Sequence, residues 1–334
     1  MAAIEVEALE RTFKGGIHAV AGIDLEVAEG EIYAFLGPNG AGKTTLVRML
    51  TTLLRPTAGH ARVAGHDVVD ESAAVRRQIG VALQEAALDP LMSGNELVRL
   101  SATLHGIPRD RGRELADSLL ERVGLTYAAE RRVGTYSGGM ARRLDLAMAL
   151  VHSPRVLFLD EPTTGLDPTS RRAIWQEVRR LNDEGTTVFL TTQYLEEADQ
   201  LADRVGIIAD GKMAAEGTPD ELKDEVGQPH LEVVVAETDQ QETERVLAEH
   251  GTVLPRHGRA VCIEVEGAVG IAPIVRALDS AGLTVETLEL RQPSLDDVFV
   301  EKTGQRLEGA ADGSPGGAEA DQDSADDRPT AAVS

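Results

Sequence analysis

The nine residues GPNGAGKTT at positions 37–45 decide the fold, because they fit the phosphate-loop pattern G-x-x-x-x-G-K-[S/T]. The run IYAFL before them is typical of a buried strand, and LVRMLTTLL after them is typical of a helix. In this context Lys43 is expected to reach the β- and γ-phosphates of ATP, and the Thr44 hydroxyl to ligate Mg²⁺. The residues of the loop predicted to bind ATP are Gly37, Pro38, Asn39, Gly40, Ala41, Gly42, Lys43, Thr44 and Thr45.

A second motif, VLFLDEP at positions 156–162, places two acidic residues at the end of an apolar run. The four apolar residues predict a buried strand, and Asp160 at its carboxyl end is expected to hold Mg²⁺ directly or through water. Glu161 follows at once and is predicted to orient and deprotonate the attacking water. Alone this run would indicate only a strand end, but beside a phosphate loop it predicts a catalytic pair.

A third stretch, TYSGGMARRLDLAMAL at positions 135–150, opens an amphipathic helix with Ser137, Gly138 and Gly139. Such a start is a candidate for a second anion-binding helix N-terminus. A plain helix cap is the open alternative, since serine is a favoured capping residue.

The spacing of apolar runs predicts two folded parts and a tail. Residues 1–226 alternate strands and helices, which indicates an α/β domain with a largely parallel sheet, and a helical insertion is expected at about 94–150. The strands of this domain are expected at 31–36, 79–83, 156–159, 187–191 and 205–208. The order β-α-β-β-α-β over 230–304 predicts a small α+β domain of the ferredoxin-like type, and 305–334 is predicted to be a disordered acidic tail.

The composition narrows the classes of partner. The 334 residues contain 33 Lys and Arg against 56 Asp and Glu, a net charge of -23, which disfavours nucleic-acid binding and polybasic membrane anchoring. No apolar run reaches the length of a membrane span, so work at a membrane would require a partner. The paired arginines, such as Arg142 and Arg143, suggest solvated helix faces.

The single cysteine excludes an intrachain disulfide and favours a reducing cytoplasm. Cys262 lies in an apolar alternating stretch and is expected to fill a core. The eight histidines show no ligand spacing with one another, with cysteine or with acidic residues, so the sequence predicts no metal cage.

The order of these motifs, with Gln84 after a strand and GLDP at 165–168, resembles ABC-type ATPases throughout residues 1–225. The resemblance implies ATP and Mg²⁺ as ligands and a head-to-tail dimer of two copies, in which the SGG stretch contacts the γ-phosphate held by the other copy. It assigns Gln84 to nucleotide and Mg²⁺ contact and to coupling with a transmembrane partner, and Asp167 to the dimer interface. Phe13 falls where the family stacks an aromatic ring on adenine, although an ordinary core phenylalanine is an open alternative.

One position departs from this pattern. After the predicted strand at 187–191 the family usually has a histidine that contacts the γ-phosphate, and here the residue is Gln193. An amide can donate a hydrogen bond to phosphate but cannot hold a proton charge. Gln193 is therefore expected to assist catalysis by contact only, which leaves Glu161 as the base.

The segments TTQYLEEADQLADRV and PSLDDVFVEKTG, with the GGM form of the third motif, resemble a narrower group. They are similar to the ATPase subunits of daunorubicin/doxorubicin-type exporters, which pair with a separately encoded membrane permease. The resemblance implies a peripheral subunit at the cytoplasmic face of the membrane that powers export of drugs or other hydrophobic small molecules. The alternatives are a soluble ABC ATPase acting on ribosomes or nucleic acid, a non-catalytic subunit, and an exporter of lipid or polysaccharide.

Overall fold

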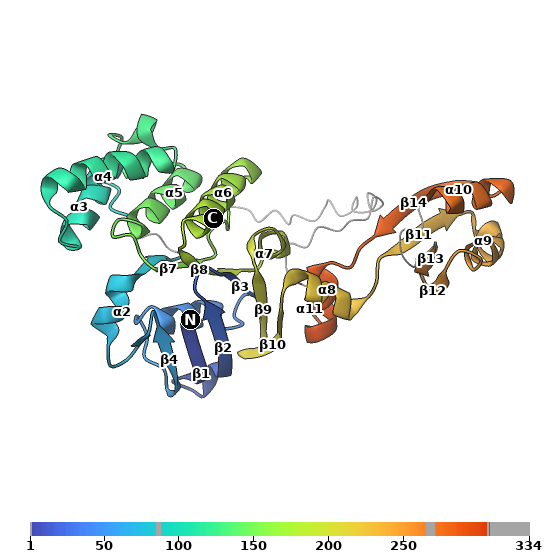
Figure 1. Ribbon diagram of the computed structural model, residues 1–334, viewed down its shortest axis with the longest axis horizontal. Helices are drawn as coiled ribbons and strands as arrows, with labels where there is room; N and C mark the ends of the chain where they lie inside the picture. The colour runs from blue at the N-terminus through green and yellow to red at the C-terminus, as the bar shows by residue number, and fades with distance from the viewer. Residues whose placement is uncertain (1, 85–87, 265–270, 306, 308–334) are drawn as a thin grey trace, which may run out of the picture.

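A six-stranded sheet forms the centre of the computed structural model, which describes residues 2–84, 88–264, 271–305 and 307 (Figure 1). Its strands pair in parallel except for the antiparallel pair of β9 with β10. In spatial order they are β10 (Lys212–Gly217), β9 (Arg204–Ala209), β3 (Ile32–Leu36), β8 (Thr187–Thr192), β7 (Val156–Asp160) and β6 (Ile79–Ala82). The parallel α/β sheet expected from the sequence is confirmed.

Strand β3 shows why the strands of this sheet are almost entirely apolar in sequence. All five of its residues are buried, and successive side chains enter different cores. Tyr33 and Phe35 pack with Phe158 and Phe189 on one face, while Ala34 and the other alternate residues enter the core on the opposite face. A strand buried on both faces has no polar side, which is the pattern of a parallel sheet covered from two directions.

An antiparallel sheet that the sequence analysis did not anticipate covers the Tyr33 face. Its spatial order is β2 (Ile17–Ala28), β1 (Ala2–Phe13), β4 (Ala58–Val63) and β5 (His66–Asp67). Helix α1 (Lys43–Leu50) packs in the core that this sheet shares with the parallel one, and α2 (Ser72–Gln78) joins β5 to β6. The phosphate loop therefore lies between strands of two sheets, since Ala19 of β2 and Ile208 of β9 both approach Gly42.

Helices cover the other face of the parallel sheet. Helices α3 (Gly94–Leu104), α4 (Arg109–Arg122) and α5 (Gly138–Ala149) gather at one end of the molecule, and α6 (Pro168–Asp183) and α7 (Leu195–Leu201) follow (Figure 1). The short 3₁₀ turns Thr126–Ala128 and Val133–Thr135 connect α4 to α5. The helical insertion expected at about 94–150 falls on the first three of these helices.

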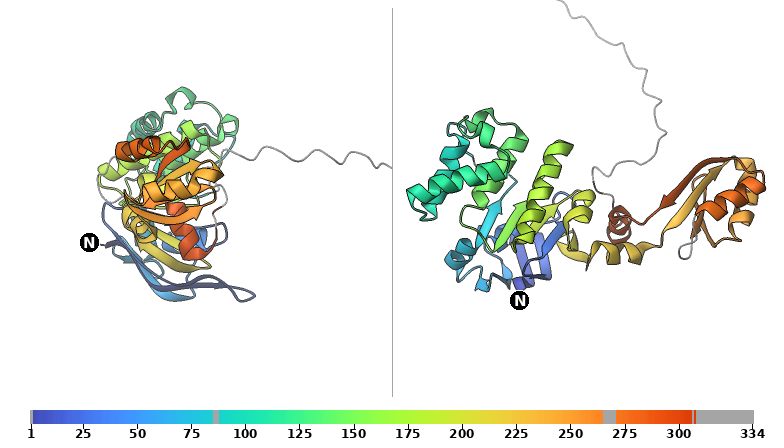
Figure 2. Two further views of the ribbon diagram at one scale, coloured as in Figure 1. Left: turned by 90° about the vertical axis from the view of Figure 1, so that its right-hand side faces the viewer. Right: turned by 45° about the horizontal axis from the view of Figure 1, so that its top comes forward.

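The C-terminal part contains a four-stranded antiparallel sheet that stands apart from the other two in Figure 1 and in the right-hand view of Figure 2. Its spatial order is β12 (Thr252–His257), β13 (Ala260–Glu264), β11 (His230–Val235) and β14 (Val285–Arg291). Helices α9 (Gln240–Leu247) and α10 (Ile271–Ser280) pack on one face, and Glu237–Asp239 forms a 3₁₀ turn before α9. The chain order is the one expected, while the ferredoxin-like classification and the domain bounds stay predictions.

The last helix, α11 (Leu295–Thr303), returns to the large core instead of packing on the C-terminal sheet. It lies against α8 (Pro219–Val226), α7 and β10, and its Lys302 Nζ lies 2.7 Å from Glu225 Oε2 of α8. Leu307 is also buried in that core, whereas the rest of the predicted tail beyond Gln305 lies outside the described residues. Among the described residues we find no helix with the length and hydrophobicity of a membrane span.

Candidate functional site

The phosphate loop leaves β3 at Gly37 and ends where α1 begins at Lys43. A Cβ on Gly37 would lie 2.5 Å from the carbonyl oxygen of Ile208, and one on Gly42 would lie 2.1 Å from that of Ala19. Gly42 also has a φ of 107°, in the left-handed region that glycine adopts without strain. The close approach of neighbouring chain segments therefore requires glycine at both positions.

Lys43 is buried at the start of α1, and its ammonium group bends back over the loop. Its Nζ donates to the carbonyl oxygens of Gly37 at 2.8 Å and Pro38 at 3.0 Å, and lies 3.3 Å from Glu161 Oε1. Burial lowers the pKa of Lys43, while the Glu161 and Asp160 carboxylates oppose that shift. The ammonium is thus held by oxygen acceptors of the kind that phosphate also offers.

Glu161 lies directly beyond β7 with a φ of 49°, a strained backbone for a non-glycine residue. Its N–H donates to the carbonyl and hydroxyl oxygens of Thr191, both at 3.1 Å. Its Oε2 accepts from Gln84 Nε2 at 3.2 Å and from Thr164 Oγ1 at 3.3 Å. The structure therefore brings three predicted site residues, Lys43, Gln84 and Glu161, into one contact group.

Asp160 ends β7 with its carboxylate facing Thr44. Its Oδ1 accepts from Thr191 Oγ1 at 2.6 Å and from Thr44 Oγ1 at 3.2 Å. Its Oδ2 is buried and has no hydrogen-bond partner among the described residues. Because Mg²⁺ prefers such oxygen donors, Thr44 and Asp160 fit the predicted metal ion. Gln84, the third predicted ligand, donates from Nε2 to Glu161, and its contact with Mg²⁺ stays a prediction.

Comparisons with known proteins agree with this geometry. Residues 20–164 match the family model described as ABC transporter, and residues 217–303 match the C-terminal domain described as ATP-binding protein DrrA1-3-like. The chain is 49% identical over 312 residues to the daunorubicin resistance ATP-binding protein DrrA3 of Streptomyces coeruleorubidus, covering 90% of this chain and 96% of that protein. The chain belongs to the ABC transporter family, in its DrrA-like group of ATP-binding subunits.

Two further likenesses extend this result. The doxorubicin resistance ATP-binding protein DrrA of Mycobacterium tuberculosis is 45% identical over 311 residues, covering 90% of this chain and 93% of that protein. The ATP-binding cassette MJ0796, solved as a dimer in a post-hydrolysis state with ADP and Pi, superposes with a TM-score of 0.60 at 28% identity. That match covers 64% of this chain and 98% of the solved one.

Two predicted contacts of this DrrA-like ATPase lie at the edge of the loop. The Phe13 ring is 38% exposed at the end of β1, with the Arg11 guanidinium 4.8 Å from its centroid, so the alternative of a core phenylalanine is wrong. Gln193 follows Thr192, whose carbonyl accepts the Gly37 N–H at 3.2 Å. The Gln193 side chain makes no hydrogen bond to any described residue, and its predicted phosphate contact stays a prediction.

The SGG stretch of the DrrA-like ATPase begins α5, and its hydrogen bonds do not involve Lys43 or Glu161. Ser137 caps the helix by accepting the Met140 N–H at 3.3 Å, so the capping alternative describes its contact here. A Cβ on Gly138 would meet nothing within 4 Å, which leaves that backbone open to an external ligand. Asp167 caps α6 by accepting the N–H groups of Thr169 and Ser170, both at 3.0 Å.

Arg142 is a site residue that sequence reasoning missed. The expectation of a solvated helix face is wrong here, because this side chain is only 9% exposed. It donates to the backbone carbonyls of Asp160 at 2.6 Å and Pro162 at 3.1 Å, and also to that of Leu83. Arg142 therefore ties α5 to the ends of β6 and β7, and nothing in its sequence spacing distinguishes it from the other paired arginines of this DrrA-like ATPase.

Glu197 is the second missed residue of the DrrA-like site. Its carboxylate is fully buried on α7, and Oε1 accepts from Thr163 Oγ1 and Trp175 Nε1, each at 2.9 Å. Burial raises the pKa of Glu197, while these donors oppose the shift. The contact with Thr163 links the loop after Glu161 to the helix that follows Gln193.

Proposed function

We propose that this chain is the ATP-hydrolysing subunit of a membrane exporter for drugs or other hydrophobic small molecules. The contact group formed by the buried Lys43 and Glu161 with the exposed Gln84 carries the proposal, because it places a lysine for phosphate, an amide and a general base within one set of contacts. The likeness to drug-resistance ATP-binding proteins, which covers 90% of this chain, supports the class of cargo.

In the proposed reaction, phosphate oxygens take over the Lys43 ammonium from the Gly37 and Pro38 carbonyls and from Glu161. The Glu161 carboxylate then accepts a proton from the water that attacks the γ-phosphate. Thr44 and Asp160 would hold Mg²⁺, which supplies charge neutralisation on the phosphates when bound. Hydrolysis thus depends on replacing the Lys43–Glu161 ion pair by an ion pair between Lys43 and phosphate. Until phosphate binds Lys43, the Glu161 carboxylate stays paired with that lysine.

We also propose that two copies close head to tail around two ATP molecules. The open backbone at Gly138 and the α5 N-terminus suit a phosphate presented by the second copy. Among the described residues, the SGG stretch makes no hydrogen bond or ion pair with this chain's own Lys43–Glu161 pair, which fits action in trans. The dimer of the similar MJ0796 cassette supports this assembly.

The proposed surface for the permease is a groove of about 440 Å³ beside Gln84. Its wall includes Leu53, Leu88, His105 and Met148, and the exposed residues Leu91 and Leu104 respectively follow Leu88 and directly precede His105 in the chain. Docking there would hold the subunit at the cytoplasmic face of the membrane and connect the permease to Glu161 through Gln84.

Export is tested by co-expressing the chain with its permease and measuring ATP-dependent daunorubicin uptake into inverted vesicles. We expect uptake that is lost in the Glu161→Gln variant. Uptake of a lipid or polysaccharide in place of the drug would favour the alternative cargo. Salt-sensitive binding to ribosomes or nucleic acid, with no vesicle transport of any kind, would contradict the exporter proposal.

Replacing Leu91 and Leu104 by aspartate should weaken recruitment to permease-containing membranes while leaving basal ATPase activity unchanged. Leu91 is 72% exposed, so the change should disturb an external contact without opening the core. Tyr127→Asp is the matched control, since Tyr127 is 69% exposed in the same helical region but belongs to the 3₁₀ turn Thr126–Ala128, which contributes no residue to the groove. Membrane co-fractionation that is equal for all three proteins would count against the groove.

Replacing Gln193 by alanine should slow ATP hydrolysis, because one hydrogen bond to the γ-phosphate would be lost. The Gln193→His variant should add an acid limb to the pH profile near the ordinary imidazole pKa of about 6.5, which the wild type lacks at this position. Steady-state ATPase rates across pH would measure both effects. An unchanged rate in the alanine variant would remove Gln193 from the phosphate site.

A further inference from the structure

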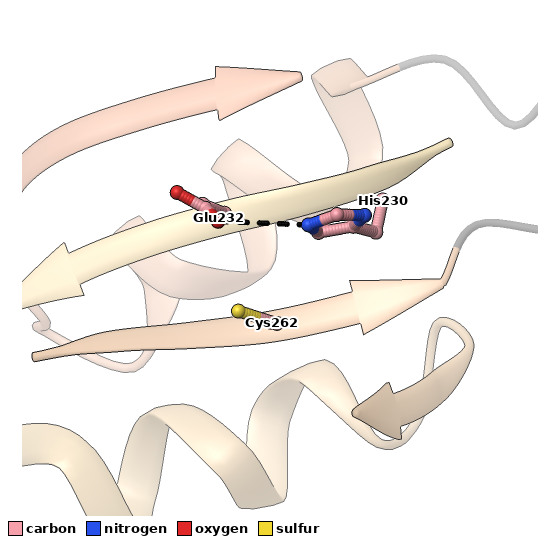
Figure 3. Close-up of side chains that lie close together, drawn as sticks. All are labelled: His230, Glu232 and Cys262. Atoms are coloured by element: carbon pink, nitrogen blue, oxygen red, sulfur yellow. Dashed lines mark ion pairs between the residues drawn. The ribbon is translucent and has the colours of Figure 1, made fainter. Parts of the chain in front are cut away.

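Three side chains with metal-ligating atoms meet on the C-terminal sheet, far from the nucleotide site in sequence. His230 and Glu232 come from β11 and Cys262 from β13, and their ligand atoms all lie within 4.8 Å of one another (Figure 3). His230 Nε2 lies 3.5 Å from Glu232 Oε1. The group occupies the face of the sheet opposite α9 and α10, whose core contains the alternate residues Leu231 and Val233.

The strand register explains how these residues meet. His230 and Glu232 are two positions apart and so share one face of β11. In the antiparallel pairing, Cys262 lies opposite Glu232, and Glu264 lies opposite His230. Directly paired side chains in such a ladder are near neighbours. The expectation of no metal cage rested on spacing along the chain, and that spacing does not reveal cross-strand neighbours.

A backbone carbonyl determines which ring nitrogen of His230 is available to bind a metal ion. Its Nδ1 lies 3.4 Å from the carbonyl oxygen of Gln228, which can accept a proton carried on Nδ1. Nε2 then keeps its lone pair and faces Glu232 (Figure 3). Metal-binding histidines generally have one ring nitrogen bound in this way, because the second contact sets the tautomer and the ring orientation.

The surroundings suit a cation. The group lines a cavity of about 580 Å³ that is also lined by Glu264 and Asp297. The cavity wall therefore has three carboxylates, counting that of Glu232, and one arginine, Arg291. Arg291 Nη1 lies 3.1 Å from Glu232 Oε1, and an entering cation would compete with it for that carboxylate. The far wall comes from Val226 at the end of α8, Pro293 just before α11, and Asp297 in the first turn of α11.

We propose that His230, Glu232 and Cys262 bind one divalent ion of the zinc class, with water or Glu264 as a fourth ligand. A thiolate and an imidazole together favour Zn²⁺ over Mg²⁺ and Ca²⁺, which take oxygen ligands. Binding forms a sulfur–metal bond and releases the Cys262 thiol proton to solvent, so affinity rises with pH. Because the cavity lies between the sheet and the α8–α11 pair, the ion stiffens the connection of the C-terminal sheet to the ATPase core.

The test titrates the full-length, reduced protein with Zn²⁺ against a chromophoric chelator in excess Mg²⁺. We expect one tight site per chain that is weakened by about a hundredfold or more in His230→Asn, Cys262→Ser and Glu232→Gln, because loss of even an outer-shell partner costs 10- to 100-fold. With Co²⁺ as the probe, the wild type should show a thiolate-to-cobalt charge-transfer band that is absent in Cys262→Ser.

Two controls separate this site from others. Asp160→Asn removes the carboxylate predicted to hold Mg²⁺, and His250→Asn removes a histidine of the same region outside the group; both should keep the tight Zn²⁺ site. Far-ultraviolet circular dichroism without metal verifies that each variant is folded. Wild-type affinity in His230→Asn and Glu232→Gln, or a wild type with no tight site and no charge-transfer band, would overturn the proposal.

Discussion

The Glu161→Gln variant is expected to bind ATP, to hydrolyse it about 10²–10⁴ times more slowly than the wild type, and to accumulate as an ATP-bound dimer. The amide keeps the shape of the side chain and its contact distance to Gln84, but it cannot accept a proton from water. It also removes the carboxylate partner of Lys43, which frees the ammonium for phosphate. Size-exclusion chromatography in Mg-ATP, with steady-state ATPase rates, measures both effects.

Two control variants are compared with Glu161→Gln: one should lose ATP binding and the other should behave as the wild type. Lys43→Ala should lose tight ATP binding and stay monomeric, because the main cation for the phosphates is removed. Glu130→Gln changes an exposed carboxylate in the helical region and should match the wild type in rate and assembly. A Glu161→Gln protein that stays monomeric at every ATP concentration, with the permease present or absent, would contradict the trans action of the SGG residues.

Contiguous motifs made the centre of the site predictable. Lys43 and Thr44 follow one strand, and Asp160 and Glu161 end another, so both pairs are local consequences of strand–loop patterns. The carboxyl ends of parallel strands lie at one edge of a sheet, and the ladder of β3, β8 and β7 brings the two pairs together. The contacts of Thr44 with Asp160 and of Lys43 with Glu161 follow from that topology.

Residues that act through long-range pairing could not be predicted in this way. Arg142 belongs to an amphipathic helix pattern, and only the packing of α5 against the ends of β6 and β7 turns it inward. The antiparallel sheet of β1 and β2 has charged residues on its outer face and bulges in its register, which blur the alternation of its sequence. The group around Cys262 depends on a cross-strand register that no local pattern encodes.

The Phe299→Ala variant is expected to destabilise the ATPase core, although Phe299 lies in the C-terminal region of the sequence. Its ring is fully buried in the same core as Leu222 of α8 and Leu201 of α7. Truncating a buried phenylalanine costs about 3–5 kcal/mol, a large part of a typical total stability of about 5–15 kcal/mol. Thermal unfolding should therefore begin about 10 °C lower than in the wild type.

The matched control for Phe299 is Val300→Ala, because Val300 is half-buried on the neighbouring face of α11 and should cost about 1 kcal/mol. Unfolding of the core can be followed by the intrinsic fluorescence of Trp175, which packs against the same core, and by the release of a fluorescent ATP analogue. Both signals should change at a lower temperature in Phe299→Ala than in the wild type. If Phe299→Ala and Val300→Ala unfolded at the same temperature, α11 would be part of the C-terminal unit alone. A selective loss in Phe299→Ala would instead show that α11 belongs to the ATPase core, where it packs against α7, the helix that carries Glu197.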